Sequence, residues 1–168
     1  GFLGGAATSC LVNPFMVSKF DGEHLVKGIF EDVIGKLIEK NAAVDGELFG
    51  QPHISFDPEI LKFILLEMAD ESGVKMLFHS FVSGSIMKGD EIKGVVLTGK
   101  SSDIKIFSKI TIDATGDGDV AAWSGALYEE GRSSDGLCQP MSLMFRVAGV
   151  DEKKMPSRDE INKTYSDE

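Results

Sequence analysis

Hydrophobic positions in the first half of the chain recur at helical spacing in two places. Between residues 23 and 40 the apolar side chains return every three or four positions, with charged residues between them, which predicts an amphipathic helix packed on a core. A second helix is predicted after Asp57, which suits the N-cap, with Pro58 in its first turn and Gly73 at its C-terminal end. The glycine-containing segment 41–56 between the two helices is expected to be irregular.

The spacing then changes to the alternation that is typical of strands. Short strands are predicted at 73–78, 81–87, 91–98 and 103–107, with hairpin connections between the later ones. A further apolar alternation favours a strand that runs into the next turn; it consists of Ile104, Ile106, Ile110 and Ile112. The predicted order is therefore helix, strand, antiparallel meander and a last strand, followed by a short helix from Val120.

The turn at 112–119 (Ile-Asp-Ala-Thr-Gly-Asp-Gly-Asp) is the most informative segment. Its glycines let backbone approach a ligand, a helix start offers unpaired N–H groups to an anion, and its aspartates can accept hydrogen bonds from ribose or ribityl hydroxyls. A calcium loop is one alternative, but its twelfth position needs a bidentate glutamate and here holds Ser124. A solvated acidic turn is the other, and the flanking pattern favours a cofactor turn over it.

Composition and charge narrow the class of protein. With 168 residues, of which 42% are hydrophobic, the chain is long enough for one domain with a real core. A formal charge of −10 disfavours nucleic acid as a partner. No apolar run approaches the roughly 20 residues that span a bilayer, and no signal segment opens the chain, so we expect a cytoplasmic protein with no membrane partner. A small-molecule substrate is the expected partner.

Four sequence blocks together resemble the FAD-dependent oxidoreductase family. They are, in order, 1–8 (Gly-Phe-Leu-Gly-Gly-Ala-Ala-Thr), 11–15 (Leu-Val-Asn-Pro-Phe), 112–119, and 139–146 (Gln-Pro-Met-Ser-Leu-Met-Phe-Arg). The resemblance implies an α/β chain: a partial FAD/NAD(P)-binding Rossmann-like fold of the glutathione reductase and fumarate reductase type. In that fold an antiparallel β-meander forms the crossover, and part of a substrate domain follows.

The resemblance also implies a domain plan. Residues 1–150 would form the partial FAD-binding domain, with a helical or substrate insertion around 41–56, and residues 151–168 would begin a truncated substrate domain or form a mobile tail. The Gly-x-Gly-x-x-Gly turn that holds the pyrophosphate in the family is not in this sequence. We therefore expect an internal fragment that binds FAD poorly alone, is itself inactive, and could self-associate through exposed apolar edges.

FAD is the cofactor that the resemblance implies for the parent protein, and it carries over to individual residues. A small-residue loop near the pyrophosphate and flavin ring would consist of Gly4, Gly5, Ala6 and Thr8. The backbone of Val82 would hold the adenine edge, although a plain core valine explains that position equally well. The turn beside the dinucleotide would consist of Ala114, Thr115, Gly116, Asp117 and Asp119.

Catalytic candidates are fewer. His53 stands in the segment expected to be irregular and could donate or accept a proton during hydride transfer. Arg132 and Arg146 could hold an anionic substrate, since a guanidinium binds carboxylates bidentately. The expected function is transfer of hydride or electrons between a small organic substrate and flavin. The alternatives are a flavoprotein subunit that passes electrons to a redox partner protein, and a non-catalytic binding module derived from a flavoprotein.

Overall fold

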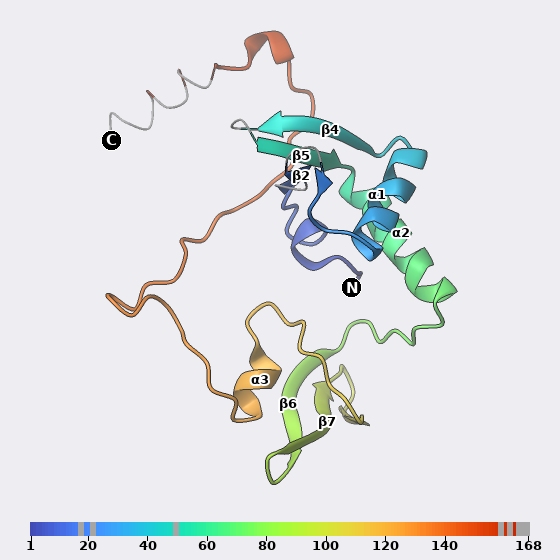
Figure 1. Ribbon diagram of the computed structural model, residues 1–168, viewed down its shortest axis with the longest axis vertical. Coiled ribbons are helices and arrows are strands. Elements are labelled where there is room, and N and C mark those ends of the chain that lie inside the picture. Colours follow the sequence, from blue (N-terminus) through green and yellow to red (C-terminus); the bar gives the residue numbers. More distant parts are fainter. Residues whose placement is uncertain (17–18, 21–22, 49–50, 158–159, 161–162, 164–168) are drawn as a thin grey trace.

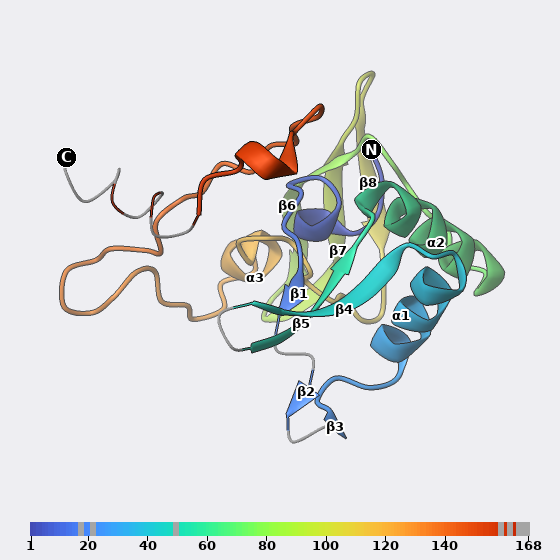
Figure 2. The ribbon, with the colours of Figure 1, turned by 90° about the horizontal axis from the view of Figure 1, so that it is seen from above.

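The computed structural model of the protein describes residues 1–16, 19–20, 23–48, 51–157, 160 and 163. Figure 1 shows two groups of elements joined by an extended segment. The first group holds helices α1 and α2 with one sheet, and the second holds the later sheet with α3. Figure 2 shows the same arrangement from above, with α1 and α2 side by side at one side of strands β4 and β5.

The first group is built from elements of the N-terminal half. They are η1 (Gly5–Ala7), β1 (Phe15–Met16), α1 (Ile29–Glu39), β4 (Ala43–Leu48), β5 (Gln51–Phe56) and α2 (Pro58–Glu71). Strand β5 lies between β1 and β4 and pairs antiparallel with both. Two more short strands, β2 (Lys19–Phe20) and β3 (Glu23–His24), pair only with each other among the described residues.

The core of this group lies where the two helices pack on the sheet. It consists of Val33, Ile34, Leu37, Ala42, Ile54, Phe56, Leu61 and Ile64. Phe15 of β1 closes one side, because its ring stacks on Phe56 at a centroid distance of 4.2 Å and meets Phe30 edge-on at 5.3 Å. The predicted apolar faces are thus confirmed as core at Val33, Ile34 and Leu37 of α1 and at Leu61 and Ile64 of α2. At the ends of the first predicted face the side chains of Val26, Ile29 and Ile38 are exposed instead, so that part of the prediction was wrong.

Helix α2 is confirmed as predicted, with its start and stop signals in place. The Asp57 carboxylate accepts hydrogen bonds from the backbone N–H groups of Glu59 (2.8 Å) and Ile60 (3.4 Å), as an N-cap should. Pro58 occupies the first helical position and Gly73 follows the C-terminal end at a φ of 69°.

Helix α1 is shorter than predicted. It begins at Ile29 rather than near residue 23, because Gly28 has a φ of 69° and interrupts the helical backbone there. The Glu31 side chain then accepts a hydrogen bond from the Gly28 N–H at 3.1 Å. Residues 23–24 belong to β3 instead, so the prediction was wrong for the first turn and a half of the helix.

The segment 41–56 is not irregular, which corrects a second prediction. It forms the antiparallel pair β4 and β5, in which Ala43 opposes Phe56 and Gly46 opposes His53. Pro52 is tolerated in the central strand because β1 pairs only with Ile54 and His53 and does not reach it. Gly46 and Pro52 are unusual in strands and made the segment look irregular in the sequence. The inward side chains of Ile54 and Phe56 complete the core.

The second group confirms the predicted meander. Strands β6 (Phe81–Lys88), β7 (Glu91–Thr98) and β8 (Asp103–Phe107) pair antiparallel in that order. Helix α3 (Asp119–Trp123) packs on β6, and the Ser85 hydroxyl donates to the Trp123 carbonyl at 2.9 Å. A last 3-10 turn, η2 (Glu152–Lys154), lies near the C-terminal end.

Two predicted strands do not form. Residues 73–78 and 109–113 run without strand pairing, and the Ile110 and Ile112 side chains are 82% and 85% exposed. A strand needs a neighbouring backbone, and no described segment offers one at either place. The structure is a mixed helix-and-sheet fold whose described ladders are all antiparallel, a composition compatible with an α/β FAD-binding type.

Candidate functional site

The turn at 113–119 is shaped from within by one carboxylate. Asp113 Oδ1 accepts hydrogen bonds from the Thr115 backbone N–H (3.0 Å) and hydroxyl (2.7 Å), while Oδ2 accepts from the Ala121 N–H (2.9 Å). The Thr115 hydroxyl oxygen in turn accepts from the Asp119 N–H at 3.0 Å. These bonds hold the pKa of Asp113 below its ordinary value, with the Thr115 hydroxyl as the largest cause and the Ala121 amide next.

Asp117 and Asp119 differ from Asp113 in the same turn. Neither carboxylate has a hydrogen bond or an ion pair within the part of the chain that the structure describes. The Asp117 side chain is exposed and that of Asp119 half-buried. Since Gly118 has a φ of 70° and starts the short helix α3, both aspartates border a turn of fixed shape while their oxygens remain able to accept hydrogen bonds from a ligand.

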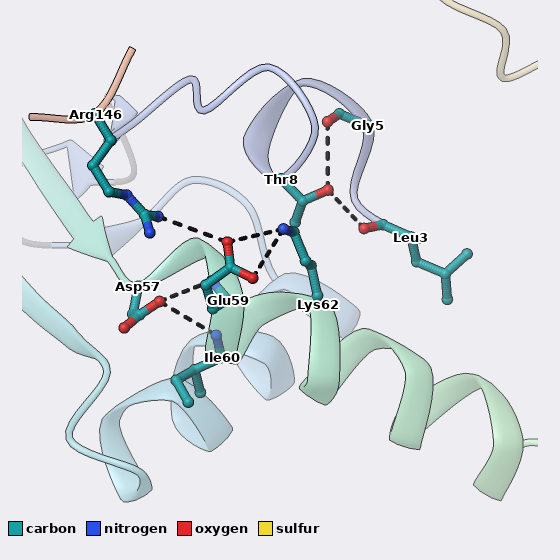
Figure 3. Close-up of polar contacts among 8 residues, drawn as sticks. All are labelled: Leu3, Gly5, Thr8, Asp57, Glu59, Ile60, Lys62 and Arg146. Carbon is teal, nitrogen blue, oxygen red and sulfur yellow. Dashed lines mark hydrogen bonds and ion pairs between the residues drawn. The ribbon is translucent and has the colours of Figure 1, made fainter. Parts of the chain in front are cut away.

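The loop of small residues at the N-terminal end is also fixed by a hydroxyl. Thr8 is 1% exposed, and its Oγ1 donates to the Leu3 carbonyl at 2.7 Å (Figure 3). A Cβ built on Gly4 would lie 2.5 Å from Thr8 Cγ2 and 3.0 Å from Leu65 of α2. Thr8 and Gly4 therefore serve packing of the loop on α2.

Gly5 and Ala6 are the members of this loop that a ligand can reach. Both are exposed, and a Cβ on Gly5 would meet no atom within 4 Å, although its φ of 48° favours glycine. Small side chains at an open surface leave room for close contact with another molecule. The sequence resemblance did not separate these two positions from Gly4 and Thr8.

The remaining cofactor candidates sit with the second group of elements. Val82 lies in β6 opposite Leu97 and is half-buried. Ala114 and Gly116 are exposed in the 113–119 turn, which leads into α3 beside the same strand. No hydrogen bond or ion pair of the described residues joins this turn to the loop at 4–8, and Figure 1 shows η1 and α3 in different groups.

His53 lies in β5 on the sheet face opposite the core residue Ile54. Its Nε2 is 3.1 Å from Ser55 Oγ, whereas Nδ1 is buried without a hydrogen-bond partner. The ring covers Gly46 so closely that a Cβ there would lie 2.7 Å from two ring atoms. The hydrogen bond with the Ser55 hydroxyl therefore positions the imidazole, and Gly46 leaves the space that the ring occupies.

Arg132 is committed to another residue of its own turn. Its Nε and Nη2 donate to the two carboxylate oxygens of Asp135 at 3.0 and 2.6 Å, and this pairing lowers the pKa of Asp135. The side chain is 65% exposed. Among the described residues no hydrogen bond joins Arg132 to His53, so the two catalytic candidates do not form one constellation.

Sequence reasoning missed a shallow surface cavity of about 470 Å³, widely open to solvent, between the β4–β5 hairpin and the start of α2. Ser55 and Arg146 line it, and so does Asn13, whose amide exchanges two hydrogen bonds with the Phe56 backbone (2.6 and 3.3 Å). The Leu-Val-Asn-Pro-Phe block contained the only signal for Asn13. Ser55 could not be found, because the segment around it was not predicted to be a strand.

Other kinds of site find no support in the described residues. No group of three or more His, Cys, Asp and Glu side chains there could hold a metal ion. Nor is any described helix both long and apolar enough to cross a membrane.

The described architecture, with an antiparallel meander leading to a glycine–aspartate turn, is compatible with an FAD-binding type of protein. Comparison with protein families gives the decisive match, because residues 1–168 match the family described as FAD dependent oxidoreductase. The chain therefore belongs to the FAD-dependent oxidoreductase family, as its sequence blocks indicated. Comparisons with curated proteins and with solved structures find no match. The family implies FAD as the cofactor and redox chemistry as the kind of function.

Proposed function

We propose that this chain forms the flavin-side part of an enzyme that transfers hydride or electrons between a small organic substrate and FAD. One observation carries the proposal. Within a single turn, the side chains of Asp113 and Thr115 accept hydrogen bonds from backbone N–H groups and so fix the shape of the backbone. The carboxylates of Asp117 and Asp119 have no hydrogen-bond partner among the described residues. A turn built in this way presents acceptors to a ligand with hydroxyl groups.

The residues present fit such a cofactor in two places. Asp117 and Asp119 would accept hydrogen bonds from ribose or ribityl hydroxyls, and the exposed Ala114 and Gly116 would let the dinucleotide approach the turn. Gly5 and Ala6 would lie against the pyrophosphate or ring, with Gly4 and Thr8 holding their loop on α2. The Val82 backbone would meet the adenine edge. FAD itself supplies the redox chemistry when bound.

A Rossmann-like arrangement belongs to the same proposal. Its support is the order of the confirmed elements, in which α2 precedes the β6–β7–β8 meander and the meander precedes the glycine–aspartate turn. That order is the one that the family resemblance implies.

His53 is the residue that we assign to proton transfer. Its ring is fixed by Ser55 and by Gly46, so a proton on Nε2 has a defined path to the Ser55 hydroxyl. Ser55 lines the cavity of about 470 Å³, which gives that hydroxyl access to a bound molecule. Histidine suits this task because its charge changes near neutral pH.

The test is FAD binding by the protein expressed from its complete gene. We expect the double variant D117N/D119N to bind FAD about tenfold more weakly, because an amide oxygen accepts a hydrogen bond from a ribose or ribityl hydroxyl less strongly than a carboxylate does. Flavin fluorescence quenching measures the affinity. Asp90→Asn is the matched control, since Asp90 is exposed in the β6–β7 turn and has no hydrogen-bond partner among the described residues. Equal affinity of the double variant and the control would contradict the proposal.

A further inference from the structure

The cavity between the β4–β5 hairpin and α2 has a mixed wall. Its volume of about 470 Å³ suits a small organic molecule rather than a macromolecule. Its wall includes Asn13, Val44, Ser55, Phe56, Asp57 and Arg146. Val44, which is 65% exposed and opposes Ser55 in the sheet, supplies an apolar surface, and Arg146 and Ser55 supply polar groups.

Arg146 is a cation whose donors are open. Its Nη2 is 3.8 Å from Glu59 Oε1, which is too long for a hydrogen bond, and it makes no other polar contact with the described residues. Glu59 is engaged elsewhere, because Lys62 Nζ donates to its two oxygens at 2.9 and 3.0 Å (Figure 3). The planar guanidinium fork at the cavity wall is therefore available to a ligand, and its geometry matches a carboxylate.

Ser55 supplies a second donor. When His53 Nε2–H donates to Ser55 Oγ across 3.1 Å, the hydroxyl proton of Ser55 is left to donate into the cavity. An anion that bridges Arg146 and Ser55 would satisfy both groups.

Asp57 is the one acidic side chain on this wall. Its Oδ1 accepts from the Glu59 and Ile60 N–H groups, so the positive end of the α2 dipole offsets its charge. Because Lys62 offsets the charge of Glu59 and the start of α2 offsets that of Asp57, the guanidinium of Arg146 favours a negatively charged ligand in the cavity.

We propose that this cavity binds a small organic carboxylate, with the carboxylate on Arg146 and Ser55 and the apolar part against Val44. The inference rests on the proposed function in one respect, since it takes the carboxylate as the substrate class of the oxidoreductase. The binding site itself is defined by this chain's own residues.

The experiment titrates 3-phenylpropanoate into the protein from its complete gene by isothermal calorimetry, with the neutral 3-phenylpropanamide as the matched ligand. We expect the carboxylate to bind, the amide to bind at least about tenfold more weakly, and Arg146→Gln to weaken carboxylate binding by a similar factor. Lys100→Gln, which removes one positive charge from the distant β7–β8 connection, should leave binding unchanged. Circular dichroism verifies that each variant is folded.

The flavin content of the same samples, read from their visible absorbance, separates the two proposals. Carboxylate binding that depends on Arg146 in protein without flavin would support the cavity while the oxidoreductase proposal fails. Flavin-loaded protein that binds the amide as well as the carboxylate, that ignores Arg146→Gln, or that binds neither ligand would overturn the carboxylate site alone. An equal loss in the Lys100→Gln control would also overturn it, because the effect would then come from general charge.

Discussion

The Asp113 Oδ2 atom accepts a hydrogen bond of 2.9 Å from the backbone N–H of Ala121, which lies eight positions further along the chain. The other carboxylate oxygen, Oδ1, accepts hydrogen bonds from both the backbone N–H and the hydroxyl of Thr115. One side chain thus ties the beginning of the glycine–aspartate turn to the first turn of α3. Asp113 shapes the turn, and in the proposed function the two later aspartates are the ones that accept hydrogen bonds from the cofactor.

The first prediction concerns the pH dependence of this bond. The pKa of Asp113 is lowered in the folded state, so its stabilisation is fully present above the unfolded pKa of about 3.9 and is lost as pH falls through the folded pKa. We expect hydrogen-exchange protection at the Ala121 amide to fall in acid below about pH 4. Asp113→Asn should lose that protection already at neutral pH, and Asp117→Asn should keep it. Undiminished protection in Asp113→Asn would show that the bond does not hold the turn.

The second prediction separates packing from cofactor contact at Thr8. Thr8→Val keeps the shape but removes the donor to the Leu3 carbonyl, so it should lower the free energy of unfolding by about 1–3 kcal/mol. Thr8→Ser keeps the hydroxyl and should cost about 1 kcal/mol for the lost methyl group. Urea unfolding measures both. A Thr8→Val variant as stable as the wild type would refute the structural role.

The third prediction compares two neighbouring glycines. Gly4→Ala places a methyl group against Thr8 at a φ of 104°, whereas Gly5→Ala meets no atom within 4 Å. We expect Gly4→Ala to reduce the free energy of unfolding by about 1–3 kcal/mol and Gly5→Ala by about 1 kcal/mol. FAD affinity should show the opposite order once each variant is folded, with Gly5→Ala the more impaired. The same order in both measurements would place the cofactor elsewhere.

The fourth prediction concerns the support of His53. Gly46→Ala brings a methyl group within 2.7 Å of the imidazole, so the ring must move away from Ser55, at a cost of about 1–3 kcal/mol. Gly35→Ala is the matched control in the exposed part of α1, where nothing lies within 4 Å and alanine should stabilise by about 0.5–1 kcal/mol. Thermal unfolding measures stability, and the imidazole NMR signals report the ring. Unshifted imidazole signals in Gly46→Ala would contradict this role of glycine.

Local signals predicted the fold well where one residue decides the geometry. Asp57 and Pro58 mark the start of α2 in the sequence, and the structure uses them as a cap and a first turn. The β6–β7–β8 meander followed from alternation and hairpin connectors. Gly28 was the corresponding signal for α1, and its positive φ outweighs the helical spacing of the apolar residues before it.

Pairing between distant segments was harder to predict. Gly46 and Pro52 are unusual in strands, and only the pairing of β5 with β1 and β4 shows why they are tolerated there. The isoleucines at 110 and 112 led to the opposite error. Their alternation is typical of a strand, but no described segment pairs with them, so no strand forms.

The candidate site shows the same division. The glycine–aspartate turn was predicted from its residue types. Only the hydrogen bonds show that Asp113 accepts from backbone N–H groups of the turn, while the other two aspartates do not. Arg132 and Arg146 were equivalent in the sequence. In the structure Arg132 donates two hydrogen bonds to Asp135, whereas Arg146 makes only an ion pair with Glu59 at 3.8 Å, without a hydrogen bond.

The most direct test of the central claim is the visible absorption spectrum of the protein expressed from its complete gene and purified under native conditions, beside that of the 168-residue chain after incubation with FAD. We expect flavin bands in the former, and little or no retained flavin in the latter. Absence of flavin from both, even after reconstitution with FAD, would contradict the assignment of this chain to a flavin-dependent oxidoreductase activity.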